Sequence, residues 1–332
     1  MQLTISIPTY NRNETLAYNL AYLLPQLTPQ CKLVILDNCS DVPVEETLRP
    51  LLAKYPDAPC EIVRNPVNIG ANANITRCLE VCETPWLWVL GDDDTPQPDA
   101  IATVLRHIAA HPNAVYINFA WDELRRATFT TRGVDEMAEK LDKSANLPWI
   151  SSSVRRAEVM RAQVKFGYQY AYSLLPHVAI LLMSLGERGE CCFSREQIVR
   201  IERDETPIEE QWSTINLALG YPVIFDLPLR QSTRERLWRK LLLTNFGHSM
   251  NLNALLYQLV LVANQGDARG TLYFYDQIIG RGYAFERRPR ERALFWAARF
   301  LFMFPQLTAL GYRLVKGRSL GDQQAQNRYT RM

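Results

Sequence analysis

The segment Val89-Leu90-Gly91-Asp92-Asp93-Asp94 places three carboxylates directly after the apolar run 85–88. The apolar run predicts a short buried strand, so the acidic side chains are expected at its end. Carboxylates this close together repel one another unless a cation lies between them. Oxygen ligands suit Mg²⁺ or Mn²⁺, which also bind phosphate groups. A turn in which Asp94 caps the helix beginning near Pro98 explains the same residues, so the rest of the chain must decide.

Short apolar strands and helical segments alternate over the first third of the chain. Strands are predicted at residues 3–7, 32–36, 61–64, 86–90 and 114–120. Helices are predicted between them at residues 15–27, 44–55, 71–82 and 98–110. This alternation predicts an α/β fold with an open, mostly parallel sheet that is covered by helices on both faces.

Polar loops follow four of these strands, at residues 8–12, 37–41, 65–70 and 92–94. Ligands of open α/β sheets bind outside the carboxyl ends of the strands, so the four loops are expected to share one site. The loop at 8–12 lacks the glycines of a Walker A or GxGxxG motif. We therefore expect a metal held by aspartates, rather than a glycine-rich loop, to bind phosphate.

Four motifs occur in a fixed order along residues 1–120. They are Ile5-Ser6-Ile7-Pro8-Thr9-Tyr10-Asn11-Arg12, Leu36-Asp37-Asn38-Cys39-Ser40-Asp41, Asn68-Ile69-Gly70-Ala71-Asn72-Ala73-Asn74 and Leu90-Gly91-Asp92-Asp93-Asp94. In order and spacing they resemble the motifs of family 2 glycosyltransferases. The resemblance implies a GT-A (Rossmann-like) sheet and a nucleotide-diphosphate-sugar donor.

The resemblance implies that the loops after the first three strands bind the nucleotide. Thr9 and Asp37 would contact the base, while the loop that contains Gly70 would pass near the nucleotide. Asp37 is also a common turn former, and Gly70 suits a backbone with positive φ, so both have a purely structural interpretation. The nucleotide-sugar-binding candidates are Pro8, Thr9, Tyr10, Arg12, Asp37, Asn68, Gly70, Asn74, Asp92 and Asp93.

Asp92 and Asp94 match the two ends of the DxD motif of this family. The resemblance implies that Asp94 ligates the Mn²⁺ or Mg²⁺ that bridges the diphosphate. Asp92 would face the ribose, or contact the metal through water, and Asp93 has the least defined role. Such an ion neutralises the negative charge that builds on a leaving nucleoside diphosphate.

The family implies inversion at the sugar, which requires a base that deprotonates the acceptor hydroxyl. Many relatives use an aspartate of a Glu-Asp pair, but the corresponding place here reads Leu174-Leu175-Pro176-His177-Val178-Ala179. His177 is our candidate, since an imidazole with a pKa near 6.5 can accept a proton at neutral pH. A core or helix-capping histidine is the alternative interpretation. Glu209 and Glu210 are the next candidates for the base.

The C-terminal third is expected to be helical. We predict a catalytic domain at 1–230, a helical region at 231–318 and a polar tail at 319–332. Residues 281–318 hold nine basic and two acidic side chains, together with many aromatic ones. This pattern suits a helix that lies in an anionic membrane surface through residues 287–318, or equally one that packs on the catalytic domain.

Overall composition narrows the class of protein and its location. The 332 residues are 47% hydrophobic and 22% charged, with a net charge of +2, so a nucleic-acid partner is not expected. Seven cysteines without a CxxC pair indicate a reducing compartment. The chain starts on a strand rather than a signal peptide. We therefore expect a cytoplasmic protein, on the inner face of the membrane if the C-terminal helix binds lipid.

These features predict a metal-assisted, inverting glycosyltransferase. Its donor would be a nucleotide-diphosphate sugar, with a UDP-sugar favoured. Its acceptor would be a hydroxyl of a glycan or lipid-linked saccharide, as in O-antigen or capsule assembly. A non-catalytic nucleotide-sugar-binding module is an alternative because the Glu-Asp pair is missing. A sugar nucleotidyltransferase is another, although its usual Gly- and Lys-rich loop is lacking. No residue pattern selects an oligomeric state.

Overall fold

The computed structural model describes residues 1–121, 125–141, 147–173, 175–200, 223–238, 240, 276, 289–304 and 306–307. The chain forms two compact units, Met1–Arg203 and Asp204–Met332. The division between these units falls inside the predicted catalytic domain of 1–230, and the predicted domain boundaries stay a prediction. The predicted tail at 319–332 lies outside the described residues.

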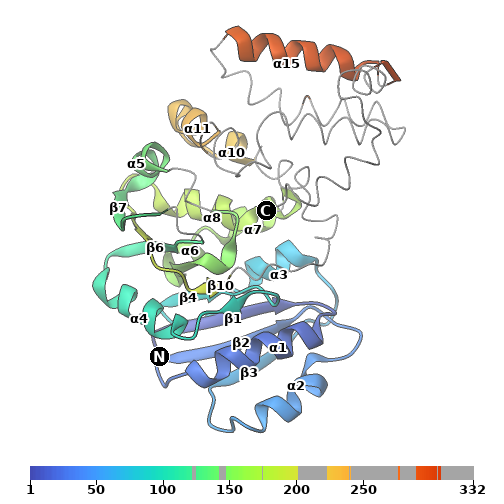
Figure 1. Cartoon of the computed structure of the whole chain (residues 1–332), viewed down its shortest axis with the longest axis vertical. Helices are drawn as coiled ribbons and strands as arrows, with labels where there is room; N and C mark the ends of the chain where they lie inside the picture. Colours follow the sequence, from blue (N-terminus) through green and yellow to red (C-terminus); the bar gives the residue numbers. More distant parts are fainter. Residues whose placement is uncertain are drawn as a thin grey trace. The chain divides into compact units, whose positions relative to one another are not determined.

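The first unit is built on an eight-stranded sheet with the order β3-β2-β1-β4-β8-β6-β9-β7 (Figure 1). Strands β1 to β4 run parallel, and β6 is parallel to β9. Only β8 and β7 run antiparallel to their neighbours. The predicted α/β fold with a mostly parallel sheet is confirmed. The strands are β1 (Leu3–Thr9), β2 (Cys31–Asp37), β3 (Cys60–Arg64), β4 (Trp86–Val89), β6 (Ala114–Phe119), β7 (Phe129–Arg132), β8 (Ser153–Arg156) and β9 (Glu190–Ser194).

The four helices predicted in the first unit all form, and each differs from the prediction at one or both termini. The first helix begins at Asn13 and ends at Leu23, because Pro25 opens a short 3-10 turn. The second helix ends at Leu52, and the third at Arg77. The helices of this unit are α1 (Asn13–Leu23), α2 (Val44–Leu52), α3 (Ala71–Arg77), α4 (Ala100–Ala110), α5 (Gly133–Lys140), α6 (Ala157–Arg161), α7 (Val164–Gln169) and α8 (Pro176–Leu185). Shorter elements are η1 (Leu24–Gln26), η2 (Ile150–Ser152), η3 (Ala171–Ser173) and the ribbon of β5 (Thr95–Pro96) with β10 (Val199–Arg200).

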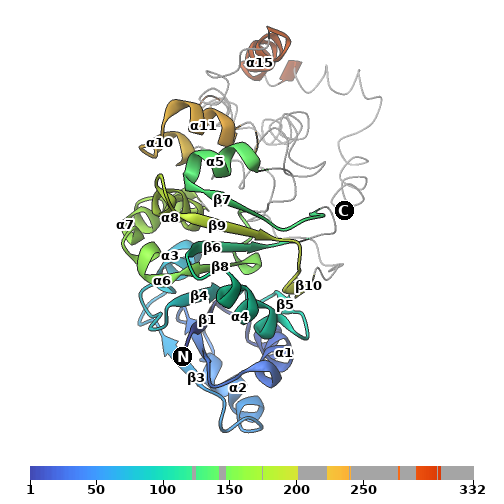
Figure 2. The same ribbon diagram turned by 90° about the vertical axis from the view of Figure 1, so that its left-hand side faces the viewer.

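Helices cover both faces of the sheet, as predicted. Figure 2 shows α1 and α4 on one side and α3, α6, α7 and α8 on the other. Side chains alternate along β1, so Leu3, Ile5 and Ile7 join the core that includes α1 and α4. Thr4 faces the other way, where its hydroxyl lies 2.8 Å from that of Thr84. Burial of apolar side chains on both faces fixes the register of the central strands.

The register of the parallel strands brings the polar loops to one edge. Thr9 at the end of β1 pairs with Asp37 at the end of β2, which pairs with Arg64 at the end of β3. Ser6 of β1 pairs with Val89 at the end of β4. The four loops at 8–12, 37–41, 65–70 and 92–94 therefore follow strand ends at the same edge.

The described helices of the second unit are α10 (Val223–Asp226), α11 (Gln231–Trp238) and α15 (Pro289–Phe302). Large apolar side chains are exposed on α15 and just beyond it. They are Trp296, Phe300, Met303, Phe304 and Leu307. Within the described part of the chain, no helix combines the length and the apolar character needed to cross a membrane.

Candidate active site

Asp94 is held in place by two donors from the segment before β8. Its Oδ2 accepts a hydrogen bond from Nε1 of Trp149 at 2.9 Å and another from the hydroxyl of Ser151. Ser151 is itself fixed, because its carbonyl accepts a 2.7 Å bond from the indole of Trp88. Among the described residues, no donor bonds to Oδ1 of Asp94. One carboxylate oxygen is thus positioned by the protein while the other is open to a ligand.

Gly91 makes this arrangement possible. Its N–H donates a 2.8 Å hydrogen bond to Oγ of Ser151. A Cβ atom at this position would lie 2.7 Å from Oδ2 of Asp94 and 3.3 Å from Oγ of Ser151. Any larger residue would therefore displace the carboxylate or its hydroxyl donor.

Both carboxylate oxygens and the backbone carbonyl of Asp92 have partners. Oδ2 accepts a 2.7 Å bond from the hydroxyl of Thr9, and Oδ1 forms an ion pair with Arg12 at 3.2 Å. Its backbone carbonyl accepts a 2.9 Å bond from Asn19 of α1. Arg12 also contacts Asp93 at 2.8 Å. The two carboxylates outweigh the effect of burial on Arg12 and raise the pKa of its guanidinium.

The electrostatics of the acidic loop favour a bound cation. Burial is the main reason why the pKa of Asp92 and that of Asp94 are each raised to about 6. Repulsion from Asp93 raises both further, while hydrogen bonds from Thr9 and Ser151 oppose the shift. A divalent ion would stabilise the charged carboxylates. The open oxygen of Asp94, in an all-oxygen donor set, fits Mn²⁺ or Mg²⁺.

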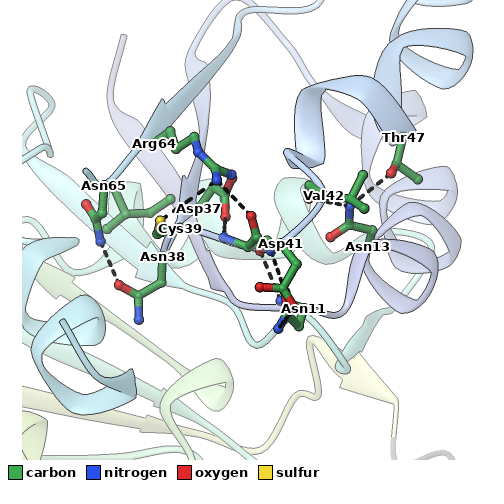
Figure 3. Close-up of polar contacts among 12 residues, drawn as sticks. Asn11, Asn13, Asp37, Asn38, Cys39, Asp41, Val42, Thr47, Arg64 and Asn65 are labelled. Carbon is green, nitrogen blue, oxygen red and sulfur yellow. Dashed lines mark hydrogen bonds and ion pairs between the residues drawn. The ribbon is translucent and has the colours of Figure 1, made fainter. Parts of the chain in front are cut away.

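Asp37 lies at the end of β2, and both of its carboxylate oxygens already have partners (Figure 3). Its Oδ1 accepts a 2.8 Å hydrogen bond from the backbone of Ser40, and its Oδ2 forms an ion pair with Arg64. Burial alone would raise the pKa of Asp37, but the bonds from Ser40 and Arg64 outweigh it and hold the pKa below the usual value. Asp37 is therefore charged, and Arg64 lies beside it.

The loops after β1 and β2 are locked together (Figure 3). Asn11 and Cys39 have φ values of 54° and 65°, a left-handed conformation that asparagine tolerates better than most residues. The side-chain amide of Asn11 donates a 3.1 Å hydrogen bond to the carboxylate of Asp41 and accepts a 2.8 Å bond from the backbone N–H of Asp41. The backbone N–H of Asn11 donates to the hydroxyl of Ser40 at 3.0 Å. The two loops, the first of which includes Pro8 and Tyr10, thus form one preorganised surface.

The third loop is tied to the second by asparagine amides. Asn38 donates a 2.7 Å hydrogen bond to Asn68, and Asn65 donates to Asn38 and Asn74 at 2.9 Å each. Gly70 has a φ of 84°, which a side chain would strain. The predicted residues Asn68, Gly70 and Asn74 thus shape the loop, and their contact with a nucleotide stays a prediction.

The structure disfavours His177 as the catalytic base. The imidazole is buried, and its Nε2 donates a 3.0 Å hydrogen bond to the carbonyl of Pro148. Burial and the nearby Arg155 lower its pKa to about 3, so it accepts a proton poorly at neutral pH. His177 instead supports the residue before Trp149. Glu209 and Glu210 lie outside the described residues.

Trp149 and Ser151 contact Asp94, an arrangement that the sequence did not predict. They are 55 and 57 positions away from Asp94, so no local pattern links them to it. The same holds for Arg64, which lies 27 positions from Asp37. Nothing in the sequence around Trp149 or Ser151 indicates that the side chain contacts a distant carboxylate.

Residues 4–148 match the sequence model of glycosyl transferase family 2. This match confirms the resemblance drawn from the four motifs. An uncharacterized glycosyltransferase from Haemophilus influenzae is 30% identical over 117 residues. That match covers 35% of this chain and 37% of the relative, so the chain spans well under half of the relative's length.

Two solved structures share the fold. The structure of S. aureus TarS 1-349 in complex with UDP-GlcNAc covers 96% of this chain and 93% of its own, with a TM-score of 0.64 and 14% identity. Mannosyltransferase PcManGT from Pyrobaculum calidifontis, in complex with GDP-Man and Mn²⁺, covers 93% of this chain and 87% of its own. Its TM-score is 0.51, with 14% identity. At these identities the likeness shows the GT-A type of fold.

Replacing Ser151 by alanine should weaken Mn²⁺-dependent binding of UDP about tenfold, because Asp94 loses the donor that orients it. Isothermal titration calorimetry at fixed Mn²⁺ measures the effect. Ser152→Ala is the matched control, since its hydroxyl donates to the carbonyl of Trp149 and not to Asp94. Equal affinities for the two variants would contradict the positioning role of Ser151.

Proposed function

We propose that this protein is an inverting, metal-assisted glycosyltransferase that uses a nucleotide-diphosphate sugar, with a UDP-sugar favoured. The observation that carries the proposal is Asp94, held by Trp149 and Ser151 with its Oδ1 open, at the sheet edge where the predicted nucleotide loops meet. The acceptor would be a hydroxyl of a glycan or a lipid-linked saccharide.

Each part of the edge has its own task in this proposal. Asp94 would hold Mn²⁺ or Mg²⁺, which supplies positive charge to the leaving nucleoside diphosphate. Asp92 is already bonded to Thr9 and Arg12, so it would position the ribose side of the donor, or the ion through water. Support comes from the two structural relatives, solved with UDP-GlcNAc and with GDP-Man and Mn²⁺.

The nucleotide base would lie against the wall made by the loops after β1 and β2. Asp37 lies there buried and charged at neutral pH, with its carboxylate bonded to Ser40 and to the half-exposed Arg64, so the guanidinium of Arg64 is the more accessible group. The locked backbone of Asn11 and Cys39 keeps this wall rigid, which reduces the entropy lost when a nucleotide binds. Glu209 and Glu210 are our remaining candidates for the base that deprotonates the acceptor.

Two alternatives differ from this proposal in turnover. A nucleotide-sugar-binding module would bind the donor without consuming it, and a sugar nucleotidyltransferase would form the donor from a sugar phosphate. Supplying a panel of UDP-, GDP-, CDP- and dTDP-sugars with Mn²⁺ and measuring both binding and nucleoside diphosphate release separates these activities. Donor binding with no release in the presence of glycan acceptors would favour the module.

Asp94→Asn should abolish the Mn²⁺ dependence of donor binding and lower affinity at least tenfold, because an amide is a poor ligand for the ion. The same variant should unfold at a higher urea concentration at pH 7. Burial raises the pKa of folded Asp94 above its unfolded value, so ionisation destabilises the folded chain as the pH rises. Calorimetry and urea unfolding measure the two effects. Asp99→Asn, a nearby carboxylate at the start of α4, should change neither, and unchanged metal dependence in Asp94→Asn would refute the assignment.

Donor binding in the presence of Mn²⁺ should weaken as the pH falls from 7 to 5. The pKa of Asp94 is about 6 without metal, so its carboxylate becomes protonated over this range and can no longer ligate an ion. A UDP-sugar suits the titration because its diphosphate diester stays ionised throughout. A flat affinity profile between these values would argue against a buried carboxylate ligand.

We also propose that the protein contacts an anionic membrane surface through residues 287–318. The exposed side chains of Trp296 and Phe300 lie four residues apart on α15, Leu307 beyond the helix is exposed as well, and this stretch is strongly basic. The double variant Trp296→Glu/Phe300→Glu should lose binding to vesicles that contain phosphatidylglycerol, measured by co-sedimentation. Tyr18→Glu, at an exposed tyrosine of the first unit, is the control and should bind as the wild type does. Absence of wild-type binding to anionic vesicles would reject the contact.

A further inference from the structure

A second group of metal-ligating side chains lies on the α4 face of the sheet, away from the acidic loop. His107 and His111 are four residues apart at the C-terminal end of α4, and Cys192 is the third residue of β9. One ring nitrogen of each histidine and Sγ of Cys192 lie within 4.8 Å of one another. His111 comes just before β6, which runs parallel to β4 because β8 is antiparallel to both. His111 is thus at the end of the sheet opposite the acidic loop.

The two ring nitrogens of His107 are arranged as in a metal-binding histidine. Its Nε2 lies 2.5 Å from a carboxylate oxygen of Glu196 and 3.1 Å from the hydroxyl of Ser194. The carboxylate requires the proton on Nε2, which leaves a lone pair on Nδ1. The His107 side chain is buried, and Nδ1 has no hydrogen-bond partner among the described residues. A histidine that donates one N–H to a carboxylate and offers its other nitrogen is the usual arrangement at metal sites.

The other two ligands face the same point. Residues four apart lie on one side of a helix, and the rings of His107 and His111 stack with 5.9 Å between centroids. Cys192 is opposite Ile117 in the sheet, and both belong to the hydrophobic core that also contains Val104 and Ile108 of α4. Its sulfur therefore points toward the helix. His111 is only partly buried, which gives an ion a path from solvent.

We propose that His107, His111 and Cys192 bind a borderline-soft divalent ion such as Zn²⁺. Two imidazole nitrogens and one thiolate are typical ligands of zinc, whereas the all-oxygen set around Asp94 prefers Mn²⁺ or Mg²⁺. Binding would replace the S–H bond of Cys192 by a metal–sulfur bond and release the proton to solvent, with no change of oxidation state. Water would fill the remaining position. The ion would join α4 to β9 and stabilise the first unit independently of catalysis.

Cobalt titration of the full-length protein, stripped with chelator, tests the site directly. Co²⁺ replaces Zn²⁺ in such sites, and its thiolate complexes absorb in the near ultraviolet. We expect one equivalent to produce this band, and Zn²⁺ to abolish it by displacement. Mg²⁺ in excess should leave the band unchanged, and so should Asp94→Ala, because the acidic loop contains no sulfur.

Matched variants assign the band to its ligands. Cys192→Ser and His111→Ala should each remove it, whereas Cys191→Ser should retain it, because the neighbouring cysteine points to the opposite face of β9. The partly buried His111 keeps the test informative if the Cys192 variant does not fold. Zn²⁺ should also raise the melting temperature of the wild type and of Cys191→Ser, and not that of His111→Ala. No thiolate band in the wild type, or a band that persists in folded His111→Ala, would overturn the proposal.

Discussion

Mutual repulsion among the carboxylates of Asp92, Asp93 and Asp94 is the constraint on which the site depends. The fold meets it with two sets of partners. Arg12 forms ion pairs with both Asp92 and Asp93, and the indole of Trp149 and the hydroxyl of Ser151 donate hydrogen bonds to Asp94. Because these last two donors are neutral, the negative charge of Asp94 stays without a counterion. The site therefore favours a cation at one oxygen rather than anywhere along the loop.

The sheet places the acidic loop beside the loops after β1, β2 and β3, so that a large ligand can contact all of them. Parallel strands in register bring Thr9, Asp37 and Arg64 to the same level. Hydrogen bonds between Asn11 and Asp41 then join the first two loops into one wall. A donor that bridges this wall and the acidic loop would meet groups that are already in place. Such preorganisation lowers the cost of ordering on binding.

Much of this could be predicted from the sequence, because strands, helices and the polar loops between them are local patterns. Their order was enough to predict a parallel sheet with its site at one edge. Contacts across the sheet could not be predicted in the same way. Ser151 reaches Asp94 only because β8 inserts beside β4, and Arg64 reaches Asp37 only through the register of β2 and β3. The same reason explains why the structure disfavours His177 as the base. Its imidazole suits a base in isolation, but the core around it removes the water that would stabilise its charge.

We propose that Asp94 anchors a divalent ion at the diphosphate of a nucleotide sugar. Anomalous scattering from crystals grown with Mn²⁺ and a UDP-sugar measures this most directly, because it locates the ion without reference to activity. We expect a manganese peak about 2 Å from Oδ1 of Asp94 and in contact with the diphosphate. A bound UDP-sugar with no manganese peak at Asp94, or with the ion on other residues, would contradict it.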